Sequence, residues 1–253
     1  MNQNIDWKKK SNDIFKLIND YRKNPRLLAK HLEGLKKYID KNNVLSEPNK
    51  IPIQMVEGED VINEAVKFLN SIKSLPPFEL DNALCQSAQD HVDDIGPKGL
   101  LSYQSSDGTE PEERIGKFGT YVEALGENID FGPNDALGVI ISLTLDDGEE
   151  ERPHRDNLFK SDYRKIGLAC GPHKSEYQMC VMDFAFDFIP HEVNNSIIKD
   201  NKNQNHSIIQ NNKEYSQGSN SQQQNSYNIK EQINKVIPQA KIEPIHENQS
   251  YAR

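Results

Sequence analysis

The distribution of apolar residues limits the part of this chain that can form a core. Large apolar side chains recur at regular intervals in the first three quarters, whereas from about His191 onward Asn, Gln, Ser and Lys dominate. Such a composition cannot bury enough apolar area to offset the entropy lost on folding. The sequence therefore predicts a flexible N-terminus over 1–10, one folded domain over 11–188 and a disordered Asn/Gln/Ser-rich tail over 189–253.

Charge and hydropathy narrow the range of partners. Lys and Arg total 30 against 39 Asp and Glu, which gives a net charge of −9. A phosphate-binding face needs clustered Lys and Arg, so we expect no nucleic-acid partner. No apolar run approaches the roughly 18–20 residues of a membrane span, and the first seven residues lack the apolar centre of a secretory signal. We therefore expect no transmembrane segment and a cytoplasmic location.

The cysteines are too few and odd in number for a disulfide scaffold. They are Cys85, Cys170 and Cys180, and this usage agrees with a reducing compartment. Cys170 and Cys180 are expected to face each other near a predicted hairpin. They are either two thiols packed in the core or a disulfide, which requires Cα atoms within about 7 Å.

Helical periodicity dominates the sequence up to about residue 145. Apolar residues recur at i, i+3, i+4 and i+7, which predicts amphipathic helices with one buried face. Ser11 and Asp81 stand where N-caps are expected, and Pro25 suits the first turn of a helix. The predicted stripes are Ile14, Leu17, Ile18 and Tyr21; Leu28, Leu32 and Leu35; Ile62, Ala65, Val66, Leu69 and Ile72; Leu84, Ala88, Val92 and Ile95; and Ala136, Val139, Ile140 and Leu143.

The period of the apolar residues changes near residue 165. Segments 165–170 and 177–188 predict two strands, with a turn at 171–174 between them. Upstream, the polar segment 46–58 is a predicted loop, and the capping box at 109–112 predicts a short helix. Helices packed around a small, mostly antiparallel sheet place the domain in the α+β class.

Four short segments follow one another over more than a hundred residues. They are LDNAL at 80–84 with Ala88 and His91; SSDGT at 105–109 with Glu113, Arg114 and Ile115; GENI at 126–129; and HRDNLF at 154–159 with Tyr163, Ile166 and Gly167. Each string is short, but their order and spacing resemble the CAP superfamily of cysteine-rich secretory, antigen 5 and pathogenesis-related 1 proteins. The HRDNLF form is closer to the bacterial and protist branch than to the animal toxins.

The resemblance implies an α-β-α sandwich with a central cleft. In the family, two histidines and two acidic residues line this cleft, and in some members they bind zinc or another divalent ion. By this resemblance Glu127 is the glutamate of the Gly-Glu-Asn motif, His154 the histidine of the fourth segment and Asp146 the second acid. Tyr103 stands where the other histidine is expected. Glu127, Asp146 and His154 remain as candidate ligands for a weakly bound divalent metal such as zinc.

The resemblance leaves the roles of the cleft residues open. His154 is a metal ligand, a general base or a histidine that ties loops by hydrogen bonds, and the incomplete ligand set favours the last. Glu127 is expected to be buried and to accept hydrogen bonds from His154 or a backbone N–H.

The family also implies two functions and a second location. The favoured function is a non-catalytic binding module for a lipid, peptide or protein partner. The alternative is a metal-dependent or serine-type hydrolase of the protease kind. Its nucleophile would be Ser102, Ser105 or Ser106, none of which lies in a nucleophile elbow. An extracellular location, typical of the family, is the alternative to the cytoplasm.

Overall fold

The computed structural model describes residues 5–191 of the chain. The disorder expected of 189–253 concerns residues that lie almost entirely outside this part and stays a prediction. Of the N-terminus expected to be flexible over 1–10, residues 7–10 belong to the first helix. Regular structure continues slightly past the predicted domain limits of 11–188, because the first helix begins at Trp7 and the last strand ends at Pro190.

The helices predicted from apolar stripes are all present. Asp81 caps its helix as expected, since its carboxylate accepts from the backbone N–H groups of Ala83 and Leu84. The helices of the described residues are α1 (Trp7–Lys23), α2 (Pro25–Leu35), the 3₁₀ turn η1 (Lys36–Tyr38), α3 (Glu59–Ser71), α4 (Asn82–Ile95), α5 (Pro111–Gly116), α6 (Ala136–Leu145) and α7 (Pro153–Phe159).

The main sheet has four strands in the order β3-β5-β6-β4. Its strands are β3 (Glu79–Leu80), β4 (Gly119–Phe131), β5 (Lys165–His173) and β6 (Tyr177–Pro190). Only β3 runs parallel to its neighbour, and the other pairs are antiparallel. A separate two-stranded ribbon pairs β1 (Val44–Leu45) with β2 (Ile53–Gln54). The sheet is therefore small and mostly antiparallel, as predicted.

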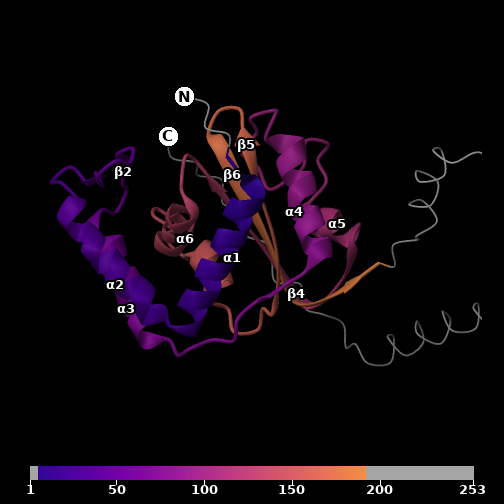
Figure 1. Ribbon diagram of the computed structural model, residues 1–253, viewed down its shortest axis with the longest axis horizontal. Coiled ribbons are helices and arrows are strands. Elements are labelled where there is room, and N and C mark those ends of the chain that lie inside the picture. The colour runs from indigo at the N-terminus through magenta and orange to yellow at the C-terminus, as the bar shows by residue number, and fades with distance from the viewer. Residues whose placement is uncertain (1–4, 192–253) are drawn as a thin grey trace, which may run out of the picture. The chain divides into compact units, whose positions relative to one another are not determined.

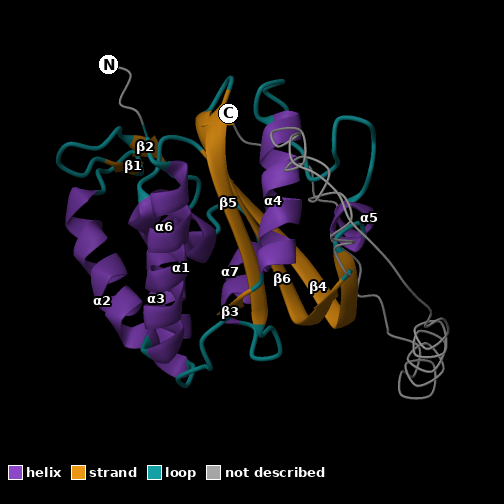
Figure 2. Ribbon diagram, turned by 45° about the vertical axis from the view of Figure 1, so that its right-hand side comes forward, coloured by secondary structure: helices purple, strands orange, loops and turns teal. Residues whose placement is uncertain are grey.

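The elements form three layers. Figures 1 and 2 show α4 and α5 on one side of the sheet and α1, α2, α3 and α6 on the other. The two faces of β6 separate these layers, because alternate side chains of a strand point to opposite faces. Met182 and Phe184 pack with the α1 side, whereas Met179 and Val181 pack with α4. This arrangement confirms the predicted α-β-α sandwich.

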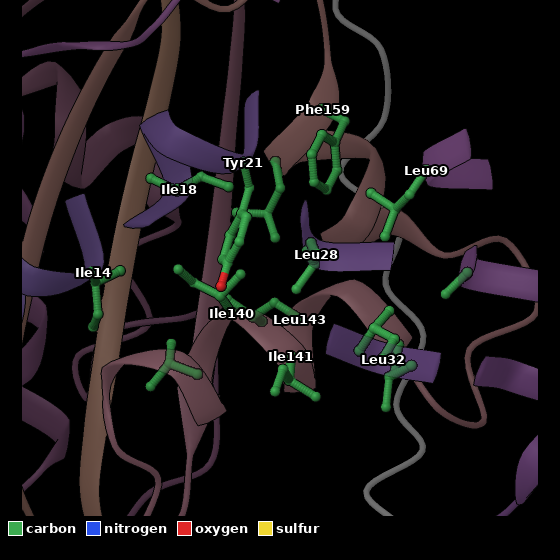
Figure 3. Close-up of a cluster of buried hydrophobic side chains, with 14 of the residues drawn as sticks. Ile14, Ile18, Tyr21, Leu28, Leu32, Leu69, Ile140, Ile141, Leu143 and Phe159 are labelled. Atoms are coloured by element: carbon green, nitrogen blue, oxygen red, sulfur yellow. The ribbon is translucent and has the colours of Figure 1, made fainter. Parts of the chain in front are cut away.

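The larger core lies on the α1 side of the sheet. Side chains from α1, α2, α3 and α6 meet there, and Figure 3 shows Ile14, Ile18, Leu28, Leu69 and Ile140 among them. The predicted stripes supply most of this core. Cys170 and Cys180 also belong to it; they oppose each other on β5 and β6 with Cα atoms 4.1 Å apart and form a disulfide. The third cysteine, Cys85, is free.

Small residues of β5 let α4 lie directly on the other face of the sheet. A Cβ atom on Gly167 would come within 2.1 Å of the backbone carbon of Leu84. A Cβ on Gly171 would come within 2.4 Å of a Val92 methyl carbon. Both distances are far below van der Waals contact, so only glycine permits this spacing between α4 and β5.

Arg22 ties α1 to the chain that leaves α7. Its side chain is fully buried and donates to the carbonyl oxygens of Pro76, Leu158 and Lys160 at 2.8–3.1 Å. The guanidinium also lies 3.8 Å from the ring centre of Phe78. Burial lowers the pKa of Arg22 to about 10. The position of α7 is therefore fixed by backbone carbonyl groups that a charged side chain holds together.

Three local predictions were wrong in detail. The first helix is capped by Asp6 rather than Ser11, because the Asp6 carboxylate accepts from the N–H of Lys9. The expected capping box does not form, since α5 begins after Glu110 without a side-chain cap. The turn between β5 and β6 lies after His173 and not at 171–174, so that Gly171 and Pro172 extend β5.

The sequence pattern missed β4 and α7. Residues 126–130 of β4 are buried on both faces, so they lack the alternation of apolar and polar residues that marks a half-buried strand. Only seven residues form α7, too few for a helical stripe. Both elements carry residues of the candidate site.

Candidate functional site

Tyr103, His154 and Asp146 form a hydrogen-bonded chain. The Tyr103 hydroxyl lies 2.5 Å from Nε2 of His154, and Nδ1 of the same ring lies 2.6 Å from Oδ1 of Asp146. The Tyr103 and His154 rings are nearly parallel, with an interplanar angle of 16°. The Asp146 side chain is buried, whereas that of His154 is 20% exposed. The chain therefore runs from a buried carboxylate toward the surface.

The three residues come from separate connections in the fold. Tyr103 lies in the loop between α4 and α5, Asp146 is the C-cap of α6, and His154 is in the first turn of α7. Asp146 adopts a left-handed conformation with φ of 53°, as does Arg152 at the start of α7 with φ of 52°. The connection between α6 and α7 is thus bounded by two non-glycine residues with positive φ, which is uncommon in proteins.

Asp146 acts as the cap of α7 although it is distant in sequence. Its Oδ2 accepts from the backbone N–H of His154 at 2.8 Å and from that of Arg155 at 3.4 Å. One carboxylate therefore orients both the ring of His154 and the helix that carries it. Because a carboxylate only accepts, Nδ1 of His154 donates to Asp146, and Nε2 of the same ring shares a second hydrogen bond with the Tyr103 hydroxyl.

Two arginines brace this connection. Arg152 forms a two-fold contact with Glu57 at 2.6 Å and donates to the carbonyl oxygen of Asp146 at 2.9 Å. Arg155 is buried and donates to the carbonyl oxygens at the end of α6, while its Nη1 contacts Glu64 at 2.6 Å. The hydrogen bonds to Arg152 and Arg155 lower the pKa of Glu57 and Glu64 below the usual range.

Glu127 is held by Arg114 and not by His154. The Arg114 guanidinium pairs with Oε2 of Glu127, and both side chains are at most 3% exposed. Arg114 also donates to the backbone carbonyl oxygen of Tyr103 at 3.1 Å. Glu127 is therefore buried as expected, but its partner is a cation that also anchors the loop of Tyr103.

A second buried acid lies beside Glu127. Asp183 on β6 is the register neighbour of Glu127 on β4, and Gly167 of β5 flanks it on the other side. Burial, and then the charge of Glu127, raise the pKa of Asp183 well above its ordinary value. With Asp183 holding its proton, the pair carries at most one negative charge, which Arg114 balances.

The opposite face of β4 supports α7. The Asn128 amide donates to the carbonyl oxygen of His154 at 2.9 Å, and Asn157 donates to the Asn128 side chain at 2.8 Å. Asp130, two residues further, accepts from the Asn134 amide at 3.1 Å. Burial raises the pKa of Asp130 to about 7, against the opposing effects of hydrogen bonds and of nearby Lys10 and His154. Neighbouring residues of β4 therefore hold two parts of the site: Glu127 pairs with Arg114, and Asn128 supports α7.

The predicted ligand set does not fit a metal ion. Both ring nitrogens of His154 are engaged, and Arg114 occupies the carboxylate of Glu127. Over residues 5–191, no group of three or more His, Cys, Asp or Glu side chains is placed to hold a metal. The expected site of Glu127, Asp146 and His154 is therefore not assembled, because each member has a protein partner in place of a shared centre.

The four residues expected in the cleft are only partly brought together. Tyr103, Asp146 and His154 are in direct contact, whereas Glu127 reaches Tyr103 through Arg114. The structure adds Arg114, Asn128 and Asn157, which the sequence reading left without a role. The sequence did contain a signal for these three residues, because all of them lie in the segments that carry the family resemblance.

The α-β-α sandwich can be compared with known protein families. The model of the cysteine-rich secretory protein family, CAP, matches residues 15–184, which is more than half of the chain. The chain therefore belongs to this family. No curated protein matches it.

The solved structures that match this chain include proteins from three organisms. An outer surface protein of Borrelia burgdorferi is 21% identical, with a TM-score of 0.38, and the match covers 50% of this chain and 86% of that one. An extracellular SCP-domain protein of Bacillus anthracis is 17% identical, with a TM-score of 0.36, over 50% of this chain and 39% of that one. The venom allergen-like protein 4 of Schistosoma mansoni is 14% identical, with a TM-score of 0.36, over 71% and 86%.

Proposed function

We propose that this CAP domain is a non-catalytic binding module, and that the surface around Tyr103 and His154 contacts a lipid, peptide or protein partner. The observation that carries the proposal is the closed hydrogen-bonded chain from Tyr103 to Asp146. It presents a phenol and a partly exposed imidazole in a fixed geometry. Fixed polar groups favour recognition, since little side-chain freedom is lost when a partner binds.

The same chain argues against general-base chemistry. A general base needs an available lone pair within reach of the substrate proton. Nε2 of His154, the nitrogen that faces away from Asp146, already forms a hydrogen bond with the Tyr103 hydroxyl. Tyr103 would have to move before His154 could take a proton from a substrate, so the resting geometry supports binding rather than turnover.

The hydrolase alternative has less support. A serine triad needs a hydroxyl next to the histidine, and Tyr103 takes that place here. The Ser106 hydroxyl contacts Asp94 at 2.6 Å and also pairs with Lys98. The carbonyl oxygen of Ser102 contacts Nε2 of His91 at 3.0 Å, which gives this buried histidine a structural role.

We further infer that the protein works in an oxidising compartment outside the cytoplasm. Disulfides persist in such compartments and are rare in the cytosol, and Cys170 is bonded to Cys180 in the core. This favours the extracellular alternative over the cytoplasmic location expected from the sequence. In the described part of the chain, no helix is long and apolar enough to cross a bilayer.

The proposed function is tested by binding and turnover in parallel. The full-length chain is immobilised, and a peptide-display library and vesicles of neutral and anionic lipid are applied to it. Casein and a p-nitrophenyl ester are used to measure hydrolysis. We expect retention of a peptide or vesicle that Tyr103→Ala abolishes, with no hydrolysis above the rate of the buffer alone.

A matched control separates the site from the general surface. Tyr177→Ala removes another tyrosine that is 76% exposed and lies at the start of β6; this variant should bind like the wild type. Hydrolysis that disappears in His154→Ala would contradict the proposal and favour the enzyme. Equal binding by wild type and Tyr103→Ala would show that the partner uses a different surface.

A further inference from the structure

We propose that Ile51, Ile53 and Val56, here called the 51–56 patch, form a docking surface for a cationic amphipathic peptide segment of a protein partner. The patch includes β2 and the residues on either side of it. Figure 2 shows β1 and β2 at one end of the layer formed by α2, α3 and α6. The proposal does not depend on ligand binding at Tyr103 and His154.

The apolar exposure of the patch is concentrated in a short segment. Ile51 is 64% exposed, Ile53 49% and Val56 58%. Single exposed apolar residues are normal on protein surfaces, whereas several together mark an interaction site. The other large apolar residues that are exposed in the described part lie apart from one another along the chain. Three within six positions therefore need a specific explanation.

The patch is held in a defined shape by its own segment. Met55 is buried in the main core, and its backbone N–H donates to the carbonyl oxygen of Asn43 at 2.9 Å. The Gln54 amide reaches back to the carbonyl oxygens of Asn42 and Met55 at 2.9 and 3.1 Å. Ile51, Ile53 and Val56 thus project from an anchored ribbon, and a partner would bind a preorganised surface.

The connection between α6 and α7 supports the other side of the patch. The Asp147 carboxylate accepts from the backbone N–H groups of Val56 and Glu57 at 2.7 and 2.9 Å. Gly148 lies against Val56, because a Cβ on Gly148 would be 3.4 Å from a Val56 methyl carbon. The acidic residues that follow Gly148 are therefore next to the patch.

Acidic residues follow the patch in the chain and also follow Gly148, which lies against Val56. Glu150 and Glu151 follow Gly148 and are exposed, and Glu59 and Asp60 are exposed in the first turn of α3. The nearest basic residue in sequence, Lys50, pairs with Glu47 at 3.0 Å. Association is favoured when opposite potentials meet and apolar side chains are buried at the centre. A complementary segment therefore carries Lys or Arg between apolar side chains.

Charge also disfavours two other possible occupants of the patch. A second copy would bring the same acidic residues to the interface, and like charges oppose association. An anionic membrane would be repelled for the same reason, given the net charge of −9. A cationic amphipathic segment is the class that satisfies both the apolar and the acidic part of the surface.

Calorimetric titration of the full-length chain with synthetic peptides tests the proposal. The probe is an amphipathic peptide of Leu and Lys, and the matched control peptide has Glu at every Lys position. We expect the Leu/Lys peptide to bind and the Leu/Glu peptide not to bind. Because exposed charges are screened by salt, affinity should fall between about 50 mM and about 500 mM salt.

Variants separate the patch from the rest of the surface. The double variant Ile51→Ser, Val56→Ser should weaken binding roughly tenfold or more, as loss of central apolar contacts does in other interfaces. Glu150→Lys should weaken it at low salt. Leu27→Ser removes a leucine that is 52% exposed on α2 and should leave binding unchanged. His154→Ala should also leave it unchanged, which distinguishes this surface from the proposed site. Melting temperatures of the variants at Ile51, Val56, Glu150 and Leu27 should match the wild type.

Several outcomes would overturn the proposal. One is equal affinity of wild type and the double variant for the Leu/Lys peptide. Another is equal binding of the Leu/Glu peptide, which would remove the role of charge. Self-association lost on Ile51→Ser, Val56→Ser would assign the patch to a second copy, and binding to anionic vesicles lost in the same variant would assign it to a membrane.

Discussion

Replacement of Arg114 by Met is the most informative perturbation of the buried site. The side chains of Arg114 and Glu127 are 3% and 1% exposed, so neither charge has access to water. Arg114→Met keeps an unbranched side chain of similar length but leaves Glu127 and Asp183 side by side without a cation. The variant also loses the hydrogen bond from Arg114 to the Tyr103 carbonyl oxygen.

The expected cost follows from these two losses. Breaking a buried ion pair from one side costs about 3–5 kcal/mol, and an ordinary hydrogen bond contributes about 1 kcal/mol. The free energy of unfolding should therefore fall by roughly 4–6 kcal/mol. Glu127→Gln should cost less, because Asp183 can then release its proton and supply the negative charge that Arg114 needs.

Urea unfolding measures this difference through the fluorescence of Trp7, the single tryptophan of the chain. With an m-value of about 2 kcal/mol/M, the midpoint of Arg114→Met should shift down by about 2–3 M. The shift should be smaller at about pH 5 than at about pH 8, because the acid pair can take up a second proton in the variant.

One control variant and two possible results test the buried pair and the role of Asp183. Arg26→Met removes an exposed arginine of α2 and should change stability by no more than about 0.5 kcal/mol. A midpoint shift below about 0.5 M for Arg114→Met would refute the buried pair, since it corresponds to only about 1 kcal/mol. A larger loss in Glu127→Gln than in Arg114→Met would refute the role given to Asp183.

Three further predictions concern protons, metals and thiols. Burial holds the pKa of Asp130 at about 7 in the folded chain; an ordinary Asp in the unfolded chain releases its proton near pH 4. Between these values only the folded chain keeps the proton, so stability falls as pH rises, and unfolding of Asp130→Asn across pH 4–7 should show less of this fall. Zinc or EDTA should leave the melting temperature unchanged, because Arg114 occupies Glu127 and His154 is engaged on both nitrogens; a rise with zinc would contradict the fit. Thiol titration of the unfolded, unreduced chain should find Cys85 alone, and after reduction all three cysteines.

The helical half of the fold could be read from the sequence because its apolar residues follow one period. The stripes of α1 to α4 and α6 recur every three or four residues, and each of them is largely buried in the structure. The stretch Gly126–Asp130 of β4 could not be recognised in this way, since both of its faces are covered and polar residues occupy the interior. Buried polar residues have hydrogen-bond partners, but the residue type does not indicate which partner each of them has.

The candidate site was predictable only in part for a related reason. The resemblance to the family named Tyr103, Asp146 and His154 as cleft residues, and these three side chains are in contact. It could not name their partners, because a resemblance transfers spacing and not contacts. It gave Glu127 a buried place, and desolvation required a partner for it. That partner, Arg114, comes from α5 and meets β4 only in the folded chain. Two side chains that pair across separate elements leave no periodic trace in the sequence.

The two glycines of β5 that face α4 have a consequence for how the site can move. Gly167 brings β5 against the backbone of α4, and Gly171 brings it against a Val92 methyl carbon, so the helix has little room to shift toward the sheet. The loop of Tyr103 starts from this closely packed helix and is anchored again by Arg114. On the other side, α7 is joined to α6 by a short connection with a strained residue at each end. Because α7 is also held, by Arg22 and Asn128, a partner that separates Tyr103 from His154 would move these two side chains rather than the helices.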